Sequence, residues 1–132
     1  MAAPPPTTRN PALFLAAVLL SLQALVAVSF GVIEVAQIRT FRMVVGAGVA
    51  VLMFGYGALL AAVARGVILV RRWSRGPAVA TQILHLPIAW SFRDGATWWV
   101  ALILAAMSMT VLVCLLIPPS TALFVDDAEA SR

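Results

Sequence analysis

The chain has 132 residues, of which 63% are hydrophobic and only 11% are charged. Soluble proteins contain roughly 45–50% apolar residues, so this composition excludes a water-soluble globular domain. All nine basic residues are arginine, and the formal net charge is +4. The arginines flank apolar runs and form no basic stripe with interleaved aromatics, which argues against a nucleic-acid partner. We therefore predict an all-α integral membrane protein whose partner is the lipid bilayer.

The N-terminal region predicts a tail followed by a membrane-spanning helix. Residues 1–10 contain Pro4, Pro5 and Pro6 and are expected to be disordered. The apolar run over 11–36 is long enough to cross about 30 Å of hydrocarbon at about 1.5 Å per residue. The alternative is a signal peptide cleaved near Ala27-Val28-Ser29. The apolar run is longer than a usual signal core, which favours a retained helix.

The second helix is predicted over 43–70 and is rich in small residues. Small residues on one face allow helix backbones to approach closely in lipid. Two interpretations remain open: packing inside the bundle, or self-association of separate copies. The candidate packing residues near one face are Gly46, Ala50, Gly57 and Ala61.

An arginine cluster follows the second helix and predicts the orientation of the chain. Positively charged loops stay on the cytoplasmic side during membrane insertion. With four spans, both termini would share that side, as expected for a multi-pass protein of a bacterial plasma membrane. The same side chains are candidates for contact with anionic lipid headgroups, at roughly 1 kcal/mol per basic residue. The cluster consists of Arg65, Arg71, Arg72 and Arg75.

The third and fourth helices are predicted over 77–93 and 97–117, which makes a four-helix bundle. Pro77 suits the first helical position, and Pro87 is expected to bend this short helix. A re-entrant segment is the alternative for 77–93. Trp98 and Trp99 are typical of the aromatic belt at the lipid–water boundary. The proline pair at 118–119 predicts the end of the fourth helix, with a flexible acidic tail over 118–132.

Four polar residues in the apolar spans are candidates for function because polar side chains are costly in lipid. Gln23 and Glu34 lie three turns apart in the first helix, and Gln82 and His85 lie one turn apart in the third. They predict a polar seam between these helices. The favoured interpretation is interhelical hydrogen bonding, worth about 0.6–2 kcal/mol in membranes. The alternative is a path for a proton, an ion or a small polar group.

The sequence contains no set of residues that predicts catalysis, a metal or a cofactor. It has one histidine and one cysteine, Cys114, which lies deep in an apolar run. Paired carboxylates within a span, a Ser–His–acid set and a glycine-rich phosphate loop are all missing from the pattern. We therefore expect a protein that is not an enzyme.

From Gly55 to Leu123 the chain resembles small integral membrane proteins of high-GC actinobacteria. The likeness is carried by the stretch Arg72-Trp73-Ser74-Arg75-Gly76-Pro77, by Gln82, and by Leu86-Pro87-Ile88-Ala89-Trp90. The Trp98-Trp99 start of the last helix and its Pro118-Pro119 end are similar too. The resemblance implies four helices and an actinobacterial source, and it implies no activity.

The expected function is that of an accessory or interaction subunit of the plasma membrane. Its helices would pack against a larger membrane protein or against copies of the same chain. The alternative is a small transporter or channel component that uses the polar seam. A transporter needs a water-accessible polar path, whereas a packing subunit needs a dry interface.

Overall fold

The computed structural model describes residues 10–38 and 42–130, and this part of the chain is entirely helical. The tail expected over residues 1–10 lies outside the described residues except for Asn10, which caps the first helix. Five α-helices and one 3-10 turn follow in order: α1 Pro11–Ala36, α2 Met43–Ile68, α3 Arg72–Ser91, η2 Gly95–Thr97, α4 Trp98–Leu116 and α5 Pro118–Ala130. The all-helical prediction is confirmed, and α5 is an additional element.

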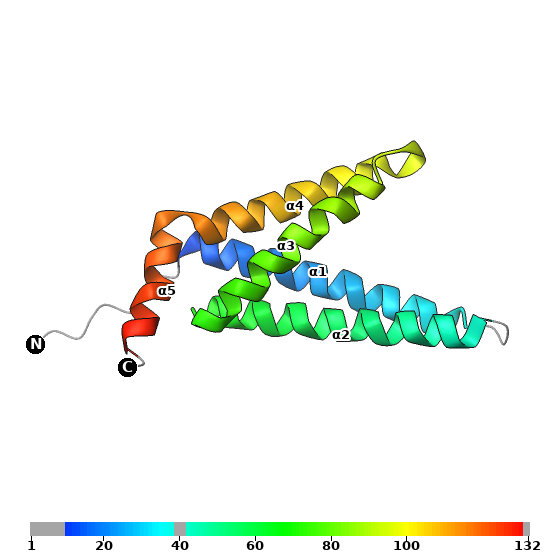
Figure 1. The fold of residues 1–132 in the computed structure, drawn as a ribbon, viewed down its shortest axis with the longest axis horizontal. Helices are drawn as coiled ribbons and strands as arrows, with labels where there is room; N and C mark the ends of the chain where they lie inside the picture. Colours follow the sequence, from blue (N-terminus) through cyan, green and yellow to red (C-terminus); the bar gives the residue numbers. More distant parts are fainter. Residues whose placement is uncertain (1–9, 39–41, 131–132) are drawn as a thin grey trace, which may run out of the picture.

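The long helices form two antiparallel hairpins, α1–α2 and α3–α4 (Figure 1). The hairpins meet at the end that holds α5 and the α2–α3 turn, and they spread apart toward the other end. Contacts join α1 to α2, α2 to α3, α3 to α4, and α4 back to α1. The four helices therefore form a ring in which α1 and α3 are diagonally opposite.

The start of α1 is fixed by a side-chain cap and a proline. The Asn10 side-chain oxygen accepts a hydrogen bond from the Ala12 backbone N–H at 3.0 Å, and Pro11 occupies the first helical position. Both features are favourable because the first backbone N–H groups of a helix have no partner within it. The predicted bounds of this helix, 11–36, agree with the structure.

The α2 helix ends at Ile68, two residues before the predicted end, in a compact turn. The Arg71 N–H donates to the Gly66 carbonyl at 2.8 Å, and the Val70 N–H donates to the Val67 carbonyl at 3.1 Å. This pair of bonds is the Schellman pattern, which requires a left-handed residue at the position of Val70. Val70 has a φ of 53°, although glycine is the usual residue there.

The α3 helix starts at Arg72, so the prediction that Pro77 is its first residue is wrong. The compact turn directs the chain straight into a helix, and Ser74 closes the first turn through hydrogen bonds to the Arg71 carbonyl. Pro77 is therefore the sixth residue of the helix, inside its second turn, where it cannot donate the usual hydrogen bond to the Trp73 carbonyl. The helix continues through Pro87 to Ser91.

The segment after α4 was expected to be a flexible tail, but it forms α5. Ile117 is extended, with a ψ of 145°, as the residue before a proline tends to be, and this ends α4. Pro118 then occupies the first position of the next helix, where proline is favoured. Ser120 and Phe124 of α5 are buried, and the Asn10 amide donates to the Ser120 hydroxyl at 3.3 Å. The start of α5 is therefore part of the packed structure.

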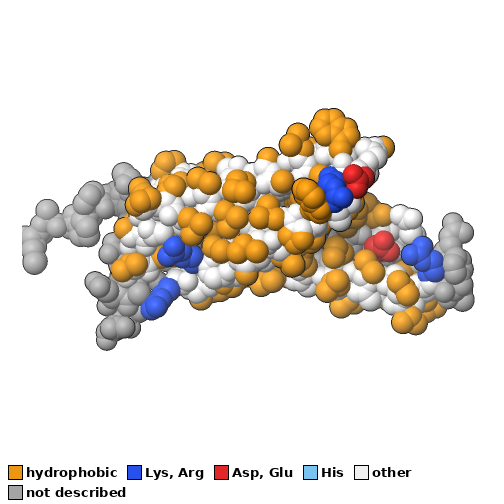
Figure 2. All heavy atoms as spheres, turned by 45° about the horizontal axis from the view of Figure 1, so that its top comes forward, with side chains coloured by type: hydrophobic (Ala, Val, Ile, Leu, Met, Phe, Trp, Pro, Cys, Tyr) orange, Lys and Arg blue, Asp and Glu red, His pale blue; other side chains and the backbone are white. Residues whose placement is uncertain are grey.

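Three helical segments are long and apolar enough to cross a membrane by length and composition: Pro11–Ala36, Met43–Ile68 and Gly95–Leu116. Figure 2 shows a broad hydrophobic band on the visible face, with charged side chains gathered toward the two ends. The core is built from small and medium apolar residues, among them Leu20, Leu60 and Val111, and Cys114 is also buried. These features define a helical membrane protein.

Candidate functional site

The centre of the bundle is crossed by a reciprocal pair of amide hydrogen bonds. The Gln23 Nε2 of α1 donates to the Gln82 Oε1 of α3 at 3.1 Å, and the Gln82 Nε2 donates to the Gln23 Oε1 at 3.0 Å. Gln82 is fully buried and Gln23 is 6% exposed. Because α1 and α3 are diagonally opposite, only long side chains can join them. Two of the four residues of the predicted polar seam, one from each helix, are therefore in contact.

A third side chain extends this contact. The Gln82 Nε2 also lies 3.4 Å from the Thr81 Oγ1, which itself donates to the Ala78 carbonyl at 3.0 Å. Both hydrogens of the Gln82 amide thus have acceptors, and its oxygen has a donor. A buried polar group that is fully hydrogen-bonded stabilises packing, whereas an unpaired one would be costly.

His85 is paired with α2, and this contact was missed from the sequence. The Tyr56 hydroxyl lies 2.7 Å from the His85 Nε2, and the two rings meet edge to face with centroids 5.9 Å apart. Tyr56 is the only tyrosine in the chain. The tyrosine hydroxyl within an apolar span was the available signal, because a buried tyrosine usually finds a hydrogen-bond partner.

Two buried side-chain atoms in the described part of the chain form no hydrogen bond. They are the His85 Nδ1 on α3 and the Ser108 Oγ on α4. Ser108 is fully buried, and His85 is 6% exposed. Serine hydroxyls in helices often bond to the carbonyl four residues earlier, as Ser21 does to Ala17. The free hydroxyl of Ser108 is thus a second polar feature that the sequence reading did not single out.

Glu34, the fourth residue of the predicted seam, lies apart from the others. It is eleven residues beyond Gln23 on α1, about 16 Å along the helix axis. Within the described residues, its side chain has no hydrogen bond or ion pair to Gln23, Gln82 or His85. In place of one seam, the structure has two separate contacts near the middle of the bundle, Gln23 with Gln82 and Tyr56 with His85.

The small residues of α2 allow it to pack closely against α1. A Cβ atom built on Gly57 would lie 2.6 Å from the Val28 Cγ2 and 3.1 Å from the Ala24 carbonyl oxygen. Such separations are shorter than van der Waals contact, so no other residue fits without movement. Gly46 and Ala50 are also buried, whereas Ala61 is exposed. Three of the four predicted packing residues thus face the interior.

The predicted headgroup cluster lies where α2 ends and α3 begins. Arg65 belongs to the last turn of α2, Arg71 and Arg72 are exposed at the turn, and Arg75 is half-buried on α3. This is the end of the molecule at which the two hairpins meet (Figure 1). Contact of these side chains with lipid headgroups stays a prediction.

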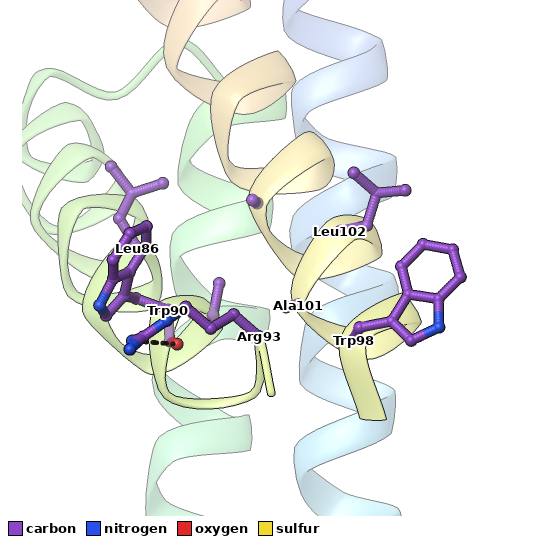
Figure 3. A pocket seen from close by; sticks show the side chains of 8 residues that line it. Leu86, Trp90, Arg93, Trp98, Ala101 and Leu102 are labelled. Atoms are coloured by element: carbon purple, nitrogen blue, oxygen red, sulfur yellow. Dashed lines mark hydrogen bonds between the residues drawn. The ribbon is translucent and has the colours of Figure 1, made fainter. Parts of the chain in front are cut away.

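The opposite end of the α3–α4 hairpin carries an open groove with a volume of about 480 Å³ (Figure 3). On α4 the lining residues fall at positions i, i+3, i+4 and i+7, and on α3 at positions i, i+3 and i+4, so each set lies on one helical face. Alanines lie along its floor, and the aromatic and leucine side chains form its sides. The lining residues are Leu86, Ala89 and Trp90 from α3, Arg93 from the connection that follows it, and Trp98, Ala101, Leu102 and Ala105 from α4.

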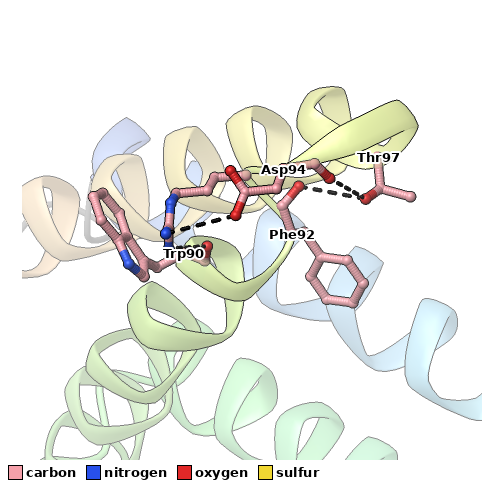
Figure 4. A network of polar contacts seen from close by, with 5 residues as sticks. Trp90, Phe92, Asp94 and Thr97 are labelled. Atoms are coloured by element: carbon pink, nitrogen blue, oxygen red, sulfur yellow. Dashed lines mark hydrogen bonds and ion pairs between the residues drawn. The ribbon is translucent and has the colours of Figure 1, made fainter.

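The rim of this groove carries a small charged network (Figure 4). The Arg93 guanidinium lies 4.4 Å from the centre of the Trp90 ring, and one of its nitrogens is 3.5 Å from the Asp94 Oδ2. The hydroxyl of Thr97 lies within 3.4 Å of the carbonyls of Phe92 and Asp94. These contacts hold Arg93 and Asp94 side by side at the mouth of the groove.

Comparisons with protein-family models, with curated proteins and with solved structures each return no match for this chain.

Proposed function

We propose that this chain is a non-enzymatic, four-span subunit of a bacterial plasma membrane, with both termini in the cytoplasm. Its role is to pack against a larger membrane protein or against further copies of itself. The observation that supports this proposal is the reciprocal pairing of Gln23 and Gln82. Amides that satisfy each other stabilise a dry interior and offer little to a passing solute.

The proposed fourth span is α3. It has 20 residues, which correspond to about 30 Å of helix, the thickness of the hydrocarbon core. Its arginines Arg72 and Arg75 lie in its first turn, where they can reach the headgroups. Beyond them, the helix carries no charged residue up to Ser91. In Figure 1 it runs antiparallel to α4 between the two ends of the molecule.

The number of spans is tested by tags on the two termini. Four spans place both termini on the same side of the membrane, whereas three spans place them on opposite sides. We expect protease or antibody to reach both tags only after the inner face of the membrane is opened. Tags on opposite sides would contradict the fourth span and would favour a re-entrant α3.

The packing role is tested by the water accessibility of the bundle centre. The single native cysteine, Cys114, is first replaced by alanine. Cysteine is then placed at Ser108, which preserves the glutamine pair, and at Asp94, which is exposed, as the positive control. A membrane-impermeant maleimide should label Asp94→Cys rapidly and leave Ser108→Cys unlabelled. Comparable labelling rates would show a water path and would overturn the packing proposal.

The partner is identified by purifying the tagged chain from native membranes in a mild detergent and measuring the native mass. A stoichiometric larger membrane protein, or a defined homo-oligomer, is expected. A chain that is monomeric at native expression levels would contradict the interaction role.

The second candidate is a small transporter or channel component. It is favoured by the two buried atoms without hydrogen bonds, the His85 Nδ1 and the Ser108 Oγ. These atoms could contact a proton donor or a small polar solute in a state that admits water. Replacing His85 with leucine separates the candidates, because a transporter would lose flux while a packing subunit would keep its partner.

A further inference from the structure

The groove at the α3–α4 end combines an apolar interior with a charged rim, which is the polarity of a phospholipid. The interior is formed by alanine, leucine and tryptophan side chains, and Arg93 is the charged residue among those that line it. The groove extends over residues 98–105 of α4, about 10 Å along the axis, and over the last turns of α3 with the connection up to Arg93. This length fits the upper part of one acyl chain, and the volume of about 480 Å³ falls within the usual range of ligand sites.

The rim residues indicate where the headgroup would lie. Trp90 and Trp98 line the groove near its mouth, and tryptophan is enriched at the headgroup level of membranes. Arg93 is 48% exposed and Asp94 is 82% exposed, so both keep surface for a further partner. The guanidinium is oriented by its contact with the Trp90 ring and by a hydrogen bond to the Trp90 carbonyl at 3.4 Å.

We propose that this groove binds a phospholipid with a phosphoethanolamine headgroup, whose phosphate contacts Arg93 and whose ammonium contacts Asp94. Arginine is well suited to phosphate because it donates several hydrogen bonds in one plane. The neighbouring carboxylate accepts hydrogen bonds from a primary ammonium, which a choline headgroup cannot donate. A headgroup with a net negative charge would instead place its charge beside Asp94. The cation–anion pair of the rim thus complements the anion–cation pair of this zwitterionic headgroup.

The site goes beyond the packing role but shares one requirement with it: the connection between α3 and α4 must lie at a membrane surface. Lipid binding in the groove can be tested separately from the packing role, because Trp90 and Trp98 line the groove and their fluorescence reports on it. Bromine atoms on acyl chains quench tryptophan fluorescence at close range. Replacing Trp73 and Trp99, which do not line the groove, with phenylalanine leaves these two reporters in the full chain.

The experiment reconstitutes this protein in phosphatidylcholine vesicles that contain a minor fraction of brominated lipid. The brominated lipid has an ethanolamine, a glycerol or a choline headgroup, at equal mole fraction. We expect the ethanolamine lipid to be preferred about fivefold over the other two, the scale of one charged contact at a membrane surface. Asp94→Asn should abolish the preference for ethanolamine over glycerol, and Arg93→Gln should weaken the binding of both.

A matched pair of variants tests whether the groove itself holds the acyl chain. Ala101→Phe fills the floor, whereas Ala106→Phe places the same side chain on α4 at an exposed position outside the groove. The preference should be lost in the first variant and kept in the second. Equal quenching by all three lipids, or a preference for the glycerol headgroup, would overturn the proposed site. No quenching by any lipid would instead contradict the membrane placement of the α3–α4 connection, on which the proposed function depends.

Discussion

Both hairpins of this protein are antiparallel helix pairs, but the helices are tightly packed in α1–α2 and leave an open groove in α3–α4. In the α1–α2 hairpin, Gly57 brings the backbones so close that even a methyl group has no room. In the α3–α4 hairpin, the outer halves of the helices leave an open groove between alanine, leucine and tryptophan side chains (Figure 3). Close contact in lipid depends on residues without bulk at the crossing point. The α1–α2 hairpin is therefore the closed half of the molecule, whereas the α3–α4 hairpin keeps an open apolar surface.

The largest expected effect comes from breaking the closed hairpin. Gly57→Ala should lower the free energy of unfolding by about 1–3 kcal/mol, because the new methyl group overlaps Val28 and the Ala24 carbonyl. The measurement is unfolding in mixed detergent micelles or by steric trapping in bicelles. The control is Gly55→Ala, since a Cβ there has no neighbour within 4 Å. Equal effects of the two variants would contradict the close contact.

The next effect concerns the link between the hairpins. Gln82→Leu should cost about 1–1.5 kcal/mol because it leaves the Gln23 amide buried without a partner. The double variant Gln23→Leu with Gln82→Leu should recover most of this loss. The coupling energy of the full mutant cycle is expected to be about 0.6–2 kcal/mol. Additive single effects would show that the two amides do not support each other.

A smaller effect is expected at the turn that joins the hairpins. Val70 is half-buried and packs against the core, yet its φ of 53° is unfavourable for a β-branched residue. Val70→Ala removes the packing and keeps the strain, whereas Val70→Gly removes both. The glycine variant should therefore be the more stable of the two by about 1 kcal/mol. A less stable glycine variant would show that the left-handed conformation is not strained.

The smallest effect is expected at the rim of the open hairpin. Both partners of the Arg93–Asp94 ion pair are substantially exposed, and such pairs contribute about 0–1 kcal/mol. Asp94→Asn should leave the unfolding free energy almost unchanged in pure phosphatidylcholine, measured as for the other variants. A loss comparable with that of Gly57→Ala would show that the rim is part of the structural core instead of a ligand site.

Some boundaries followed from local sequence signals and others did not. The Asn10-Pro11 pair defines the start of α1: Asn10 accepts a hydrogen bond from one of the unpaired N–H groups, and Pro11 has no N–H to leave unpaired. Pro77 seemed to define the start of α3 in the same way. That prediction failed because the turn before it is set by a tertiary contact. A Cβ on Gly66 would lie 2.5 Å from the Ser74 Cβ, so the two helices already touch there.

The same distinction applies to the polar residues. The depth of each residue follows from its position along the helix. This suggested a polar seam between the first and third helices, but it did not single out the contact of Gln23 with Gln82. Which helix His85 faces depends on the rotation of each helix about its axis, and apolar spans carry little information about rotation. Its contact with Tyr56 was therefore missed.

The proline pair that ended α4 also started α5, because proline disfavours helix before it and favours helix after it.

The reciprocal glutamine pair also has a consequence for the order of biosynthesis. Gln23 and Gln82 are 59 residues apart, which is roughly 3–12 s of translation at about 5–20 residues per second. During that interval the newly inserted α1–α2 hairpin holds an amide whose partner does not yet exist. A glutamine amide carries both a donor and an acceptor, so two of them can pair with each other. In a chain that stops before Gln82, the Gln23 amide should therefore pair with the Gln23 amide of a second truncated chain.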